Sequence, residues 1–394
     1  MGRQVSARQL PPIHGSAERG FERVVAEFET NFRERQEVGA AFSVYHEGRC
    51  VVDIWAGLAD RREERLWQQN TLSIVFSGSK GVVAACILLL LDRGQLELEA
   101  PVARYWPEFG THGKEAIRVR DVLTHTARLP GIDTPLLIYE ITDDIRLADL
   151  LAAQTPSVDP RAQHCYHAFT YGWLCGEIVR RVTGKGIGVF LTEEIATVLD
   201  LEAWIGLPTE LESRVAVLEL ADDWPSTPCM QPDALRHDYL NKSIYGNPPL
   251  FMWPTFPWNT EPYHAAEIPA VNAIASARSL ACLYGRLGEL VSQQTLALAR
   301  APLVDAWDEL HEQPHRYSTG FQVQQDPPIF GPAADAFGHW GAGGSCHGAW
   351  PAHEIGFSYV MNLMSDASAV DPRPTALLNA LHECLLNRKR TDRQ

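Results

Sequence analysis

The chain has 394 residues, of which 45% are hydrophobic and 21% are charged, and its formal net charge is −15 at pH 7. This composition is typical of a folded globular protein and excludes a disordered chain. Because the negative charge repels phosphate backbones and anionic lipid, we expect no nucleic-acid partner and no membrane partner. No apolar leader follows Met1, and the apolar run at 81–91 is shorter than the roughly 20 residues of a membrane span, so we expect a cytoplasmic protein.

The first part of the chain predicts a helix and then a hairpin. Apolar residues recur at steps of three and four through 17–36, which is the spacing of an amphipathic helix. Residues 39–45 and 50–55 read as strands on either side of a polar, glycine-containing turn, which predicts a β-hairpin. A long apolar run after Ser77 predicts a buried helix that begins where a loop delivers this serine.

The rest of the chain predicts a helical middle and a return to strands. Helical periodicity and proline-rich loops dominate from about 96 to 316. Strand patterns reappear at the end and are followed by a last helix; they lie at 319–324, 336–340 and 356–361, and the helix at 372–386. We therefore predict an α+β fold in which both chain ends form one antiparallel sheet, flanked by helices, with an inserted helical lobe. The predicted boundaries are 1–68 and 317–394 for the sheet domain and 69–316 for the lobe that carries the nucleophile helix, in a single catalytic unit.

Ser77 and Lys80 are the candidate catalytic pair. They stand three residues apart at the start of the predicted helix, where side chains at that spacing share one face. A serine hydroxyl becomes a nucleophile when a neighbouring base removes its proton, and a lysine with a depressed pKa is such a base. The alternative is that Ser77 caps the helix and that Lys80 is a solvated residue of the first turn.

This arrangement resembles the serine β-lactamase and penicillin-binding-protein superfamily, in particular class C β-lactamases and family VIII carboxylesterases, which share the S-x-x-K signature. The similarity continues at 121–131, 166–184, 272–283 and 337–345. It implies a three-layer α/β/α β-lactamase-like fold. It also implies an acyl-enzyme mechanism, in which Tyr166 corresponds to the tyrosine of the family's Y-x-N motif and exchanges protons with Lys80.

The third family motif, K-T-G, corresponds here to His339-Trp340-Gly341. The resemblance implies an oxyanion hole formed by the backbone N–H groups of Ser77 and Ala342. Histidine thus replaces lysine at position 339, and Ala168 stands where the family has the asparagine of Y-x-N. Both departures favour esters over β-lactams and peptidoglycan stems, although His339 could also be an ordinary strand histidine.

Further residues are candidates for contact with a substrate or a metal. We expect His167 and three aromatic residues of a proline-rich loop, Trp253, Phe256 and Trp258, in substrate binding, although the aromatic residues could equally be core. Residues 311–315 match HExxH, but Pro314 is incompatible with the helix that this zinc motif needs. The eight cysteines are dispersed without a CxxC pair, which predicts reduced and mostly buried thiols. We expect neither a metal nor a cofactor.

The sequence therefore predicts a serine hydrolase that cleaves carboxylic esters through an acyl-Ser77 intermediate. One alternative is an acyltransferase or transesterase that passes the acyl group to an alcohol or amine in a biosynthetic pathway. Others are a β-lactamase, a peptidase, or a catalytically silent binding module that kept the fold. The expected partner is a small-molecule ester or acyl substrate, and self-association into a homo-oligomer is compatible with the sequence.

Overall fold

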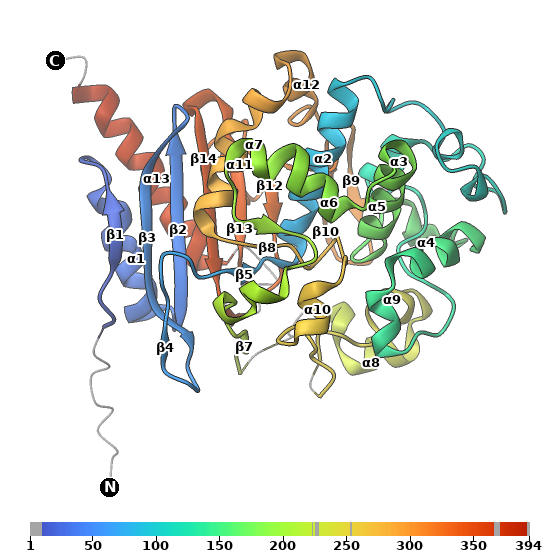
Figure 1. The fold of residues 1–394 in the computed structure, drawn as a ribbon, viewed down its shortest axis with the longest axis horizontal. Coiled ribbons are helices and arrows are strands. Elements are labelled where there is room, and N and C mark those ends of the chain that lie inside the picture. Colours follow the sequence, from blue (N-terminus) through green and yellow to red (C-terminus); the bar gives the residue numbers. More distant parts are fainter. Residues whose placement is uncertain (1–9, 223, 225–227, 253, 366–370, 392–394) are drawn as a thin grey trace, which may run out of the picture.

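A ten-stranded antiparallel sheet extends from the left edge of the molecule in Figure 1, at β1, to beyond its centre, at β10 and β9, and joins strands from both ends of the chain. The computed structural model describes residues 10–222, 224, 228–252, 254–365 and 371–391. The strand order is β1-β3-β2-β14-β13-β12-β11-β10-β9, with β4 paired to β3. The bounds are β1 (His14–Ala17), β2 (Gly39–His46), β3 (Arg49–Asp60), β4 (Arg65–Leu66), β9 (Val304–Asp308), β10 (Gln313–Tyr317), β11 (Gln322–Val323), β12 (Phe337–Trp340), β13 (Cys346–Trp350) and β14 (Ile355–Met361).

Helices cover both faces of this sheet, which confirms the predicted three-layer α+β fold. Helices α1 (Glu22–Glu34) and α13 (Pro372–Thr391) pack against each other on one face, and α11 (Ala277–Leu290) packs against β2 and β14 on the other. Phe21, Phe28 and Leu381 belong to the apolar cluster under α1 and α13, together with Phe42 and Phe357 of the sheet. Burial of these side chains on folding is the main stabilising contribution in this layer.

The helical lobe lies on the right in Figure 1. Its helices are α3 (Val119–Leu123), α4 (Asp144–Ala153), α5 (Thr170–Thr183), α6 (Ile187–Leu191), α7 (Thr197–Leu199), α8 (Pro232–His237), α9 (Tyr239–Tyr245), α10 (Glu261–Ala265) and α12 (Gln293–Leu298). Short strands complete it: β5 (Ser73–Ile74), β8 (Ile274–Ala275) and β6 (Ala203–Trp204) form one small sheet, and β7 (Glu219–Leu220) pairs with β15 (Leu363–Met364).

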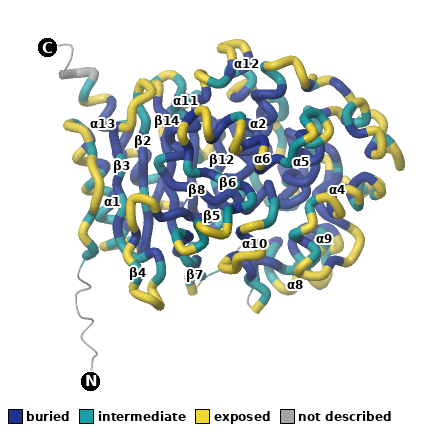
Figure 2. Tube along the Cα trace, viewed as in Figure 1, coloured by how far each residue is buried: buried dark blue, intermediate teal, exposed yellow. Residues whose placement is uncertain are grey.

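Helix α2 (Ser79–Asp92) runs through the centre of the molecule, where Figure 2 shows the chain as buried. Its residues from Ser79 to Leu90 are all buried, as expected from a helix without a polar face. It packs against α5 of the lobe and against β12 of the sheet. The nucleophile helix is therefore shared by both halves of the molecule.

Two predicted boundaries are wrong. The sheet begins again at β9 and β10, from Val304 to Tyr317, whereas the sequence predicted a lobe that extends to residue 316. The buried residues of β10 are His315 and Tyr317, so this strand lacks the aliphatic alternation by which strands are recognised. The chain also enters the fold through β1, a polar edge strand paired to β3 by its backbone, and α1 starts at Glu22 instead of residue 17.

All eight cysteines are free, and seven of them are buried while Cys50 is exposed, which confirms the predicted pattern of thiols. Among the described residues, no helix combines the length and the apolar character needed to cross a membrane.

Candidate active site

Ser77 lies in a tight 3-10 turn, η1 (Phe76–Gly78), at the entrance to α2. The preceding residue, Phe76, has a φ of +45°, in the left-handed region that a non-glycine residue adopts only under strain. Its buried ring packs against Phe251 and Trp258, with ring centroids 5.4 and 5.5 Å away. This aromatic packing holds the strained turn, which leaves Ser77 half-buried at its tip.

Lys80 is completely buried one helical turn further on. Its Nζ lies 3.1 Å from Ser77 Oγ and donates to the carbonyl oxygens of Ala168 (2.7 Å) and Ala270 (3.0 Å). Burial holds the pKa of Lys80 well below its ordinary value. A neutral amine has two N–H groups for the two carbonyls, and its lone pair then points at the serine hydroxyl. The geometry therefore suits Lys80 as a base for Ser77.

Tyr166 completes the cluster around the serine. It lies in the loop between η5 (Pro160–His164) and α5, and its ring centroid is 4.6 Å from Lys80 Nζ. Burial raises the pKa of the Tyr166 phenol above its ordinary value, and the hydrogen bond with Ser77 and the charge of His311 offset this rise only in part. The structure thus brings together all three residues that the sequence singled out as catalytic.

His339 lies near the end of β12, with its ring 6.2 Å from the ring of Tyr166. Its Nδ1 donates to the carbonyl oxygen of Trp340 at 2.8 Å, and its buried Nε2 has no hydrogen-bond partner among the described residues. Burial lowers the pKa of His339 well below 6.5, so the ring is neutral at pH 7. Its Nε2 is therefore a buried acceptor without a partner among the described residues.

The loop after β12 rests directly on the backbone that leads to the serine. A Cβ placed on Gly341 would lie 2.1 Å from the carbonyl oxygen of Val75, so only glycine fits this approach. Ser345 Oγ donates to the same carbonyl at 3.0 Å. Because Val75 is two residues before Ser77, this contact places Gly341, the neighbour of the half-buried Ala342, against the segment that leads into the turn of Ser77.

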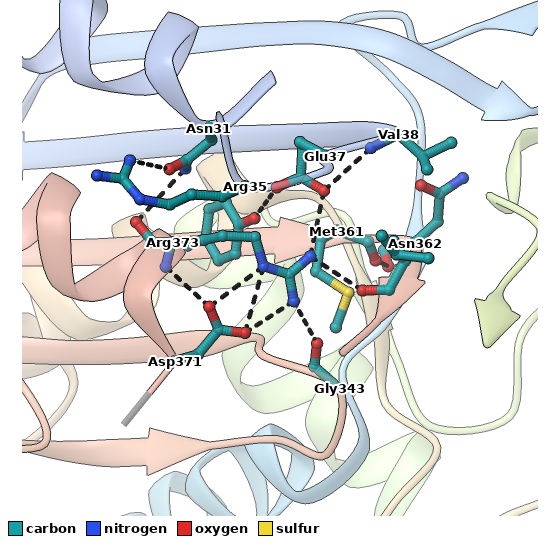
Figure 3. A network of polar contacts seen from close by, with 12 residues as sticks. Asn31, Arg35, Glu37, Val38, Gly343, Met361, Asn362, Asp371 and Arg373 are labelled. Atoms are coloured by element: carbon teal, nitrogen blue, oxygen red, sulfur yellow. Dashed lines mark hydrogen bonds and ion pairs between the residues drawn. The ribbon is translucent and has the colours of Figure 1, made fainter. Parts of the chain in front are cut away.

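A buried ionic network holds the same loop from behind (Figure 3). The guanidinium of Arg373 donates to the carbonyl oxygens of Gly343 (2.6 Å) and Leu363 (3.0 Å). It also forms ion pairs with Asp371 (2.7 Å) and Glu37 (3.3 Å). Arg373 therefore links α13 and the end of α1 to the glycine loop of the third motif.

The predicted substrate-binding residues are placed as follows. Both ring nitrogens of His167 are occupied, since Nε2 accepts from Leu129 N–H at 3.1 Å and Nδ1 donates to Cys165 O at 2.7 Å. We assign His167 to positioning this loop rather than to substrate. Trp258 is fully buried and supports the turn before Ser77, Phe256 packs half-buried against the core, and Trp253 lies outside the described residues.

The sequence reasoning missed His347. This residue faces His339 across β12 and β13, and its Nδ1 lies 2.7 Å from Ser358 Oγ. Its buried Nε2 has no partner among the described residues and points at the nucleophile turn, 2.8 Å from where a Cβ of Gly78 would lie. Burial lowers the pKa of His347 to about 3. Only the register of β12 and β13 puts His339 and His347 side by side, and no local sequence pattern predicts this pairing.

The segment 311–315 forms a turn and the start of β10, so its two histidines do not share a helical face. His315 donates from Nε2 to the Thr124 carbonyl at 2.7 Å. Cys165, Asp308 and His311 place one potential metal ligand each within 4.8 Å of one another. However, the ring nitrogens of His311 lie 2.7 Å from Asp308 Oδ2 and 2.7 Å from the Tyr245 hydroxyl, so the cluster is satisfied by hydrogen bonds without an ion.

Comparisons with known proteins agree with this geometry. The family model described as Beta-lactamase matches residues 21–382. The chain is 33% identical over 367 residues to the esterase/beta-lactamase LipL of Mycobacterium tuberculosis, covering 89% of this chain and 83% of that protein. A solved family VIII carboxylesterase superposes with a TM-score of 0.86 at 32% identity, covering 95% of this chain and 100% of that one. A penicillin-binding-protein homologue from Caulobacter crescentus superposes with a TM-score of 0.83 at 33% identity, again covering 95% and 100%.

Proposed function

The chain belongs to the β-lactamase family, and on that premise we propose that it is a serine hydrolase that cleaves carboxylic esters through an acyl-Ser77 intermediate. The observation that carries the proposal is the 3.1 Å approach of Lys80 Nζ to Ser77 Oγ. A buried amine beside a half-exposed hydroxyl is the pair that nucleophilic acyl transfer needs. The names of two relatives, an esterase/beta-lactamase and a carboxylesterase, support an ester as the substrate class.

In the proposed acylation step, Ser77 Oγ attacks the ester carbonyl while its proton passes to the Lys80–Tyr166 pair. A bond forms between Oγ and the carbonyl carbon, and the carbonyl π electrons move to the oxygen. We assign the backbone N–H groups of Ser77 and Ala342 to this oxyanion. When the intermediate collapses, the bond to the alcohol oxygen breaks and Tyr166 returns the proton to the leaving group.

Deacylation repeats the sequence with water as the nucleophile. The Lys80–Tyr166 pair accepts a proton from water as its oxygen attacks the acyl carbon, and Ser77 Oγ then leaves with that proton. The carboxylic acid is released and the enzyme regains its starting state. An alcohol or amine that replaced water in this step would give acyl transfer from the same intermediate.

Two side chains favour esters over β-lactams. His339 is neutral at pH 7, so it supplies no fixed positive charge for the carboxylate of a β-lactam. Ala168 presents only a methyl group where the family pattern has an asparagine, and its carbonyl oxygen is already engaged by Lys80 at 2.7 Å. A simple ester requires neither a positive charge for a carboxylate nor the asparagine side chain.

The test is covalent labelling of Ser77 together with ester turnover. We expect a fluorophosphonate probe to add one group per chain, mapped to Ser77 by peptide mass spectrometry, and p-nitrophenyl acetate to show burst kinetics. Ser77→Ala should lose both signals. Ser79→Ala is the matched control, because this buried serine accepts from Ala273 N–H and lies away from the proposed chemistry, so it should keep the adduct. A wild-type chain with no burst and no adduct on Ser77 would refute the proposal.

The same reaction distinguishes hydrolysis from acyl transfer. Turnover is repeated with an added alcohol or amine, and the products are separated by mass. We expect the free acid to dominate. Predominant ester or amide product would replace the hydrolase assignment with that of an acyltransferase.

A further inference from the structure

Asp308 is a buried carboxylate at the end of β9, directly behind Tyr166. Its Oδ2 accepts from the backbone N–H of Tyr166 at 2.8 Å. Its Oδ1 accepts from the backbone N–H groups of Leu310 and His311, each at 3.0 Å. Burial raises the pKa of Asp308, but the hydrogen bond and charge of His311, followed by these backbone donors, outweigh burial and hold the pKa below its ordinary value. An ionised carboxylate in this interior requires a counter-charge.

His311 supplies that counter-charge. Among the described residues it is the only basic side chain within ion-pair distance of Asp308, with Nδ1 2.7 Å from Oδ2. Its Nε2 lies 2.7 Å from the Tyr245 hydroxyl. Burial lowers the pKa of His311, whereas its ion pair with Asp308 raises it. Tyr245, whose own pKa burial raises well above 10, is neutral at pH 7 and offers Nε2 a hydroxyl contact without a charge.

The His311 ring meets the ring of Tyr166 edge to face, at 6.0 Å between centroids and an interplanar angle of 88°. The other histidines near Tyr166 bring no charge. Burial holds the pKa values of His339 and His125 well below 6.5, and His125 lies 4.8 Å from the Tyr166 ring. Of these three histidines, only His311 has a carboxylate partner that favours its cationic form.

We propose that Asp308 and His311 form a fixed counter-charge for Tyr166, in which the imidazolium stabilises the phenolate as this tyrosine exchanges its proton with Lys80 and Ser77. This inference deepens the proposed function and rests on it, because the acidity of Tyr166 affects turnover only if Ser77 is acylated. Asp308 and His311 are positioning residues that act through Tyr166 and do not touch the substrate. The imidazolium of His311 supplies a positive charge near Tyr166, whereas the neutral His339 of the third motif supplies none.

The groups that face His311 determine its response to pH. They come from several elements: Asp308 of β9, Tyr245 of α9, Tyr166 and Cys165 of the loop before α5, Cys229 of η8 (Pro228–Met230), and His315 of β10. Removal of the imidazolium charge would leave Tyr166 harder to ionise. The acid limb of the activity profile would then move to higher pH, since the base form would appear later.

The first test compares His311→Asn with the wild-type chain. Asparagine keeps an N–H group near the position of Nδ1, so the hydrogen bond to Asp308 survives while the positive charge is lost. We expect the acid limb of kcat/KM for p-nitrophenyl acetate to shift up by about one to two pH units, with recovery of activity above that limb. An equal loss of activity at every pH would show a purely structural role and overturn the inference.

His315→Gln is the matched control. This histidine lies on the same hairpin and donates from Nε2 to Thr124 O, a bond that glutamine can reproduce. Burial lowers the pKa of His315 to about 4, so its replacement removes no charge at neutral pH. We expect the acid limb of this variant to stay at the wild-type pH, and a shift as large as that of His311→Asn would count against the inference.

A second readout does not depend on ester turnover. Imidazole nitrogen NMR at about pH 7.5 should show His311 protonated at both ring nitrogens. With ¹³Cζ-labelled tyrosine assigned through Tyr166→Phe, the Tyr166 signal should titrate at higher pH in His311→Asn than in the wild-type chain. A neutral His311 would overturn the inference even if esters are hydrolysed.

Stoichiometric zinc in the purified protein, lost in His311→Asn, would overturn it in favour of a metal site at Cys165, Asp308 and His311. If esters are not hydrolysed, the proposed function fails while the NMR result still decides this inference.

Discussion

At the scale of single residues, the proposed chemistry depends on the burial of Lys80. Solvated lysine is protonated at neutral pH and cannot accept a proton, so the proposed base role requires the fully buried position that α2 gives the amine. The carbonyls of Ala168 and Ala270 then orient the amine toward Ser77. Burial and three hydrogen-bond partners, Ser77 Oγ and the two carbonyls, thus determine the proposed role of this lysine.

Lys80→Met tests this role. Methionine fills the same volume without a polar head, so we expect acylation of Ser77 to fall by about 10²- to 10⁴-fold, the usual contribution of a general base. The midpoint of thermal unfolding should be unchanged or higher, because a buried amine is replaced by an apolar group. Measurement of kcat/KM and of the unfolding midpoint on the same preparation checks both. Activity close to wild type would remove Lys80 from the mechanism.

At the scale of elements, the site depends on contacts between segments that are distant in sequence. Arg373 at the start of α13 ties Glu37, just after α1, to Gly343 in the loop after β12. Tyr359 of β14 adds a hydrogen bond from its hydroxyl to Glu37. The network fixes the loop that contains Ala342, and Figure 3 shows its members converging on the guanidinium.

Arg373→Met should therefore destabilise the fold. The substitution leaves the buried carboxylates of Glu37 and Asp371 without their cation, which we expect to cost about 3–5 kcal/mol of unfolding free energy. Urea unfolding followed by circular dichroism measures this loss. The matched control is Arg23→Ala, which breaks a solvent-exposed ion pair to Glu383 between the same two helices and should cost less than about 1 kcal/mol. Equal effects of both variants would contradict a buried network.

At the scale of the whole molecule, the interior holds an unusual number of neutral histidines. His125, His167, His339 and His347 are buried around the site, and burial lowers the pKa of each. In the unfolded chain the same groups bind protons near pH 6.5. Below that pH the unfolded state binds more protons than the folded state, so their contribution to stability is present above pH 6.5 and declines on acidification.

This imbalance predicts an acid-labile fold. For His167 and His347, whose pKa values burial lowers to about 3, the loss extends from about pH 6.5 down to about pH 3. Each contributes about 1.4 kcal/mol per pH unit within that window. His311 has a raised pKa, so its contribution to stability is complete below about pH 6.5 and is lost only as the pH rises above that value. It therefore does not change the expected loss of stability on acidification. The urea midpoint measured from about pH 8 to pH 4 should fall steadily below about pH 6.5, and a constant midpoint would contradict the burial of neutral rings.

Part of this protein can be derived from its sequence alone. The periodicity of 39–55 and of 356–361 predicts strands that the structure pairs as β2, β3 and β14, and the apolar run after Ser77 predicts α2. The order of the motifs predicts the fold and the trio of Ser77, Lys80 and Tyr166 that the structure brings together. Side-chain periodicity is enough to reveal the strands and the helix, because it repeats at a fixed spacing, whereas the fold and the role of Tyr166 are implied by the resemblance of the motifs to the family.

Only the tertiary structure reveals what lies around that trio. Asp308 meets Tyr166 across 142 residues of sequence, and Arg373 meets Glu37 across 336. His347 reaches the nucleophile turn only because the register of β12 and β13 sets it opposite His339. Such contacts leave no periodic signal in the sequence, because the segments that make them are distant along the chain and meet only when the chain folds. The sequence by itself singles out Ser77 and Lys80 as the proposed nucleophile and base, whereas the folded chain decides which buried charges surround them.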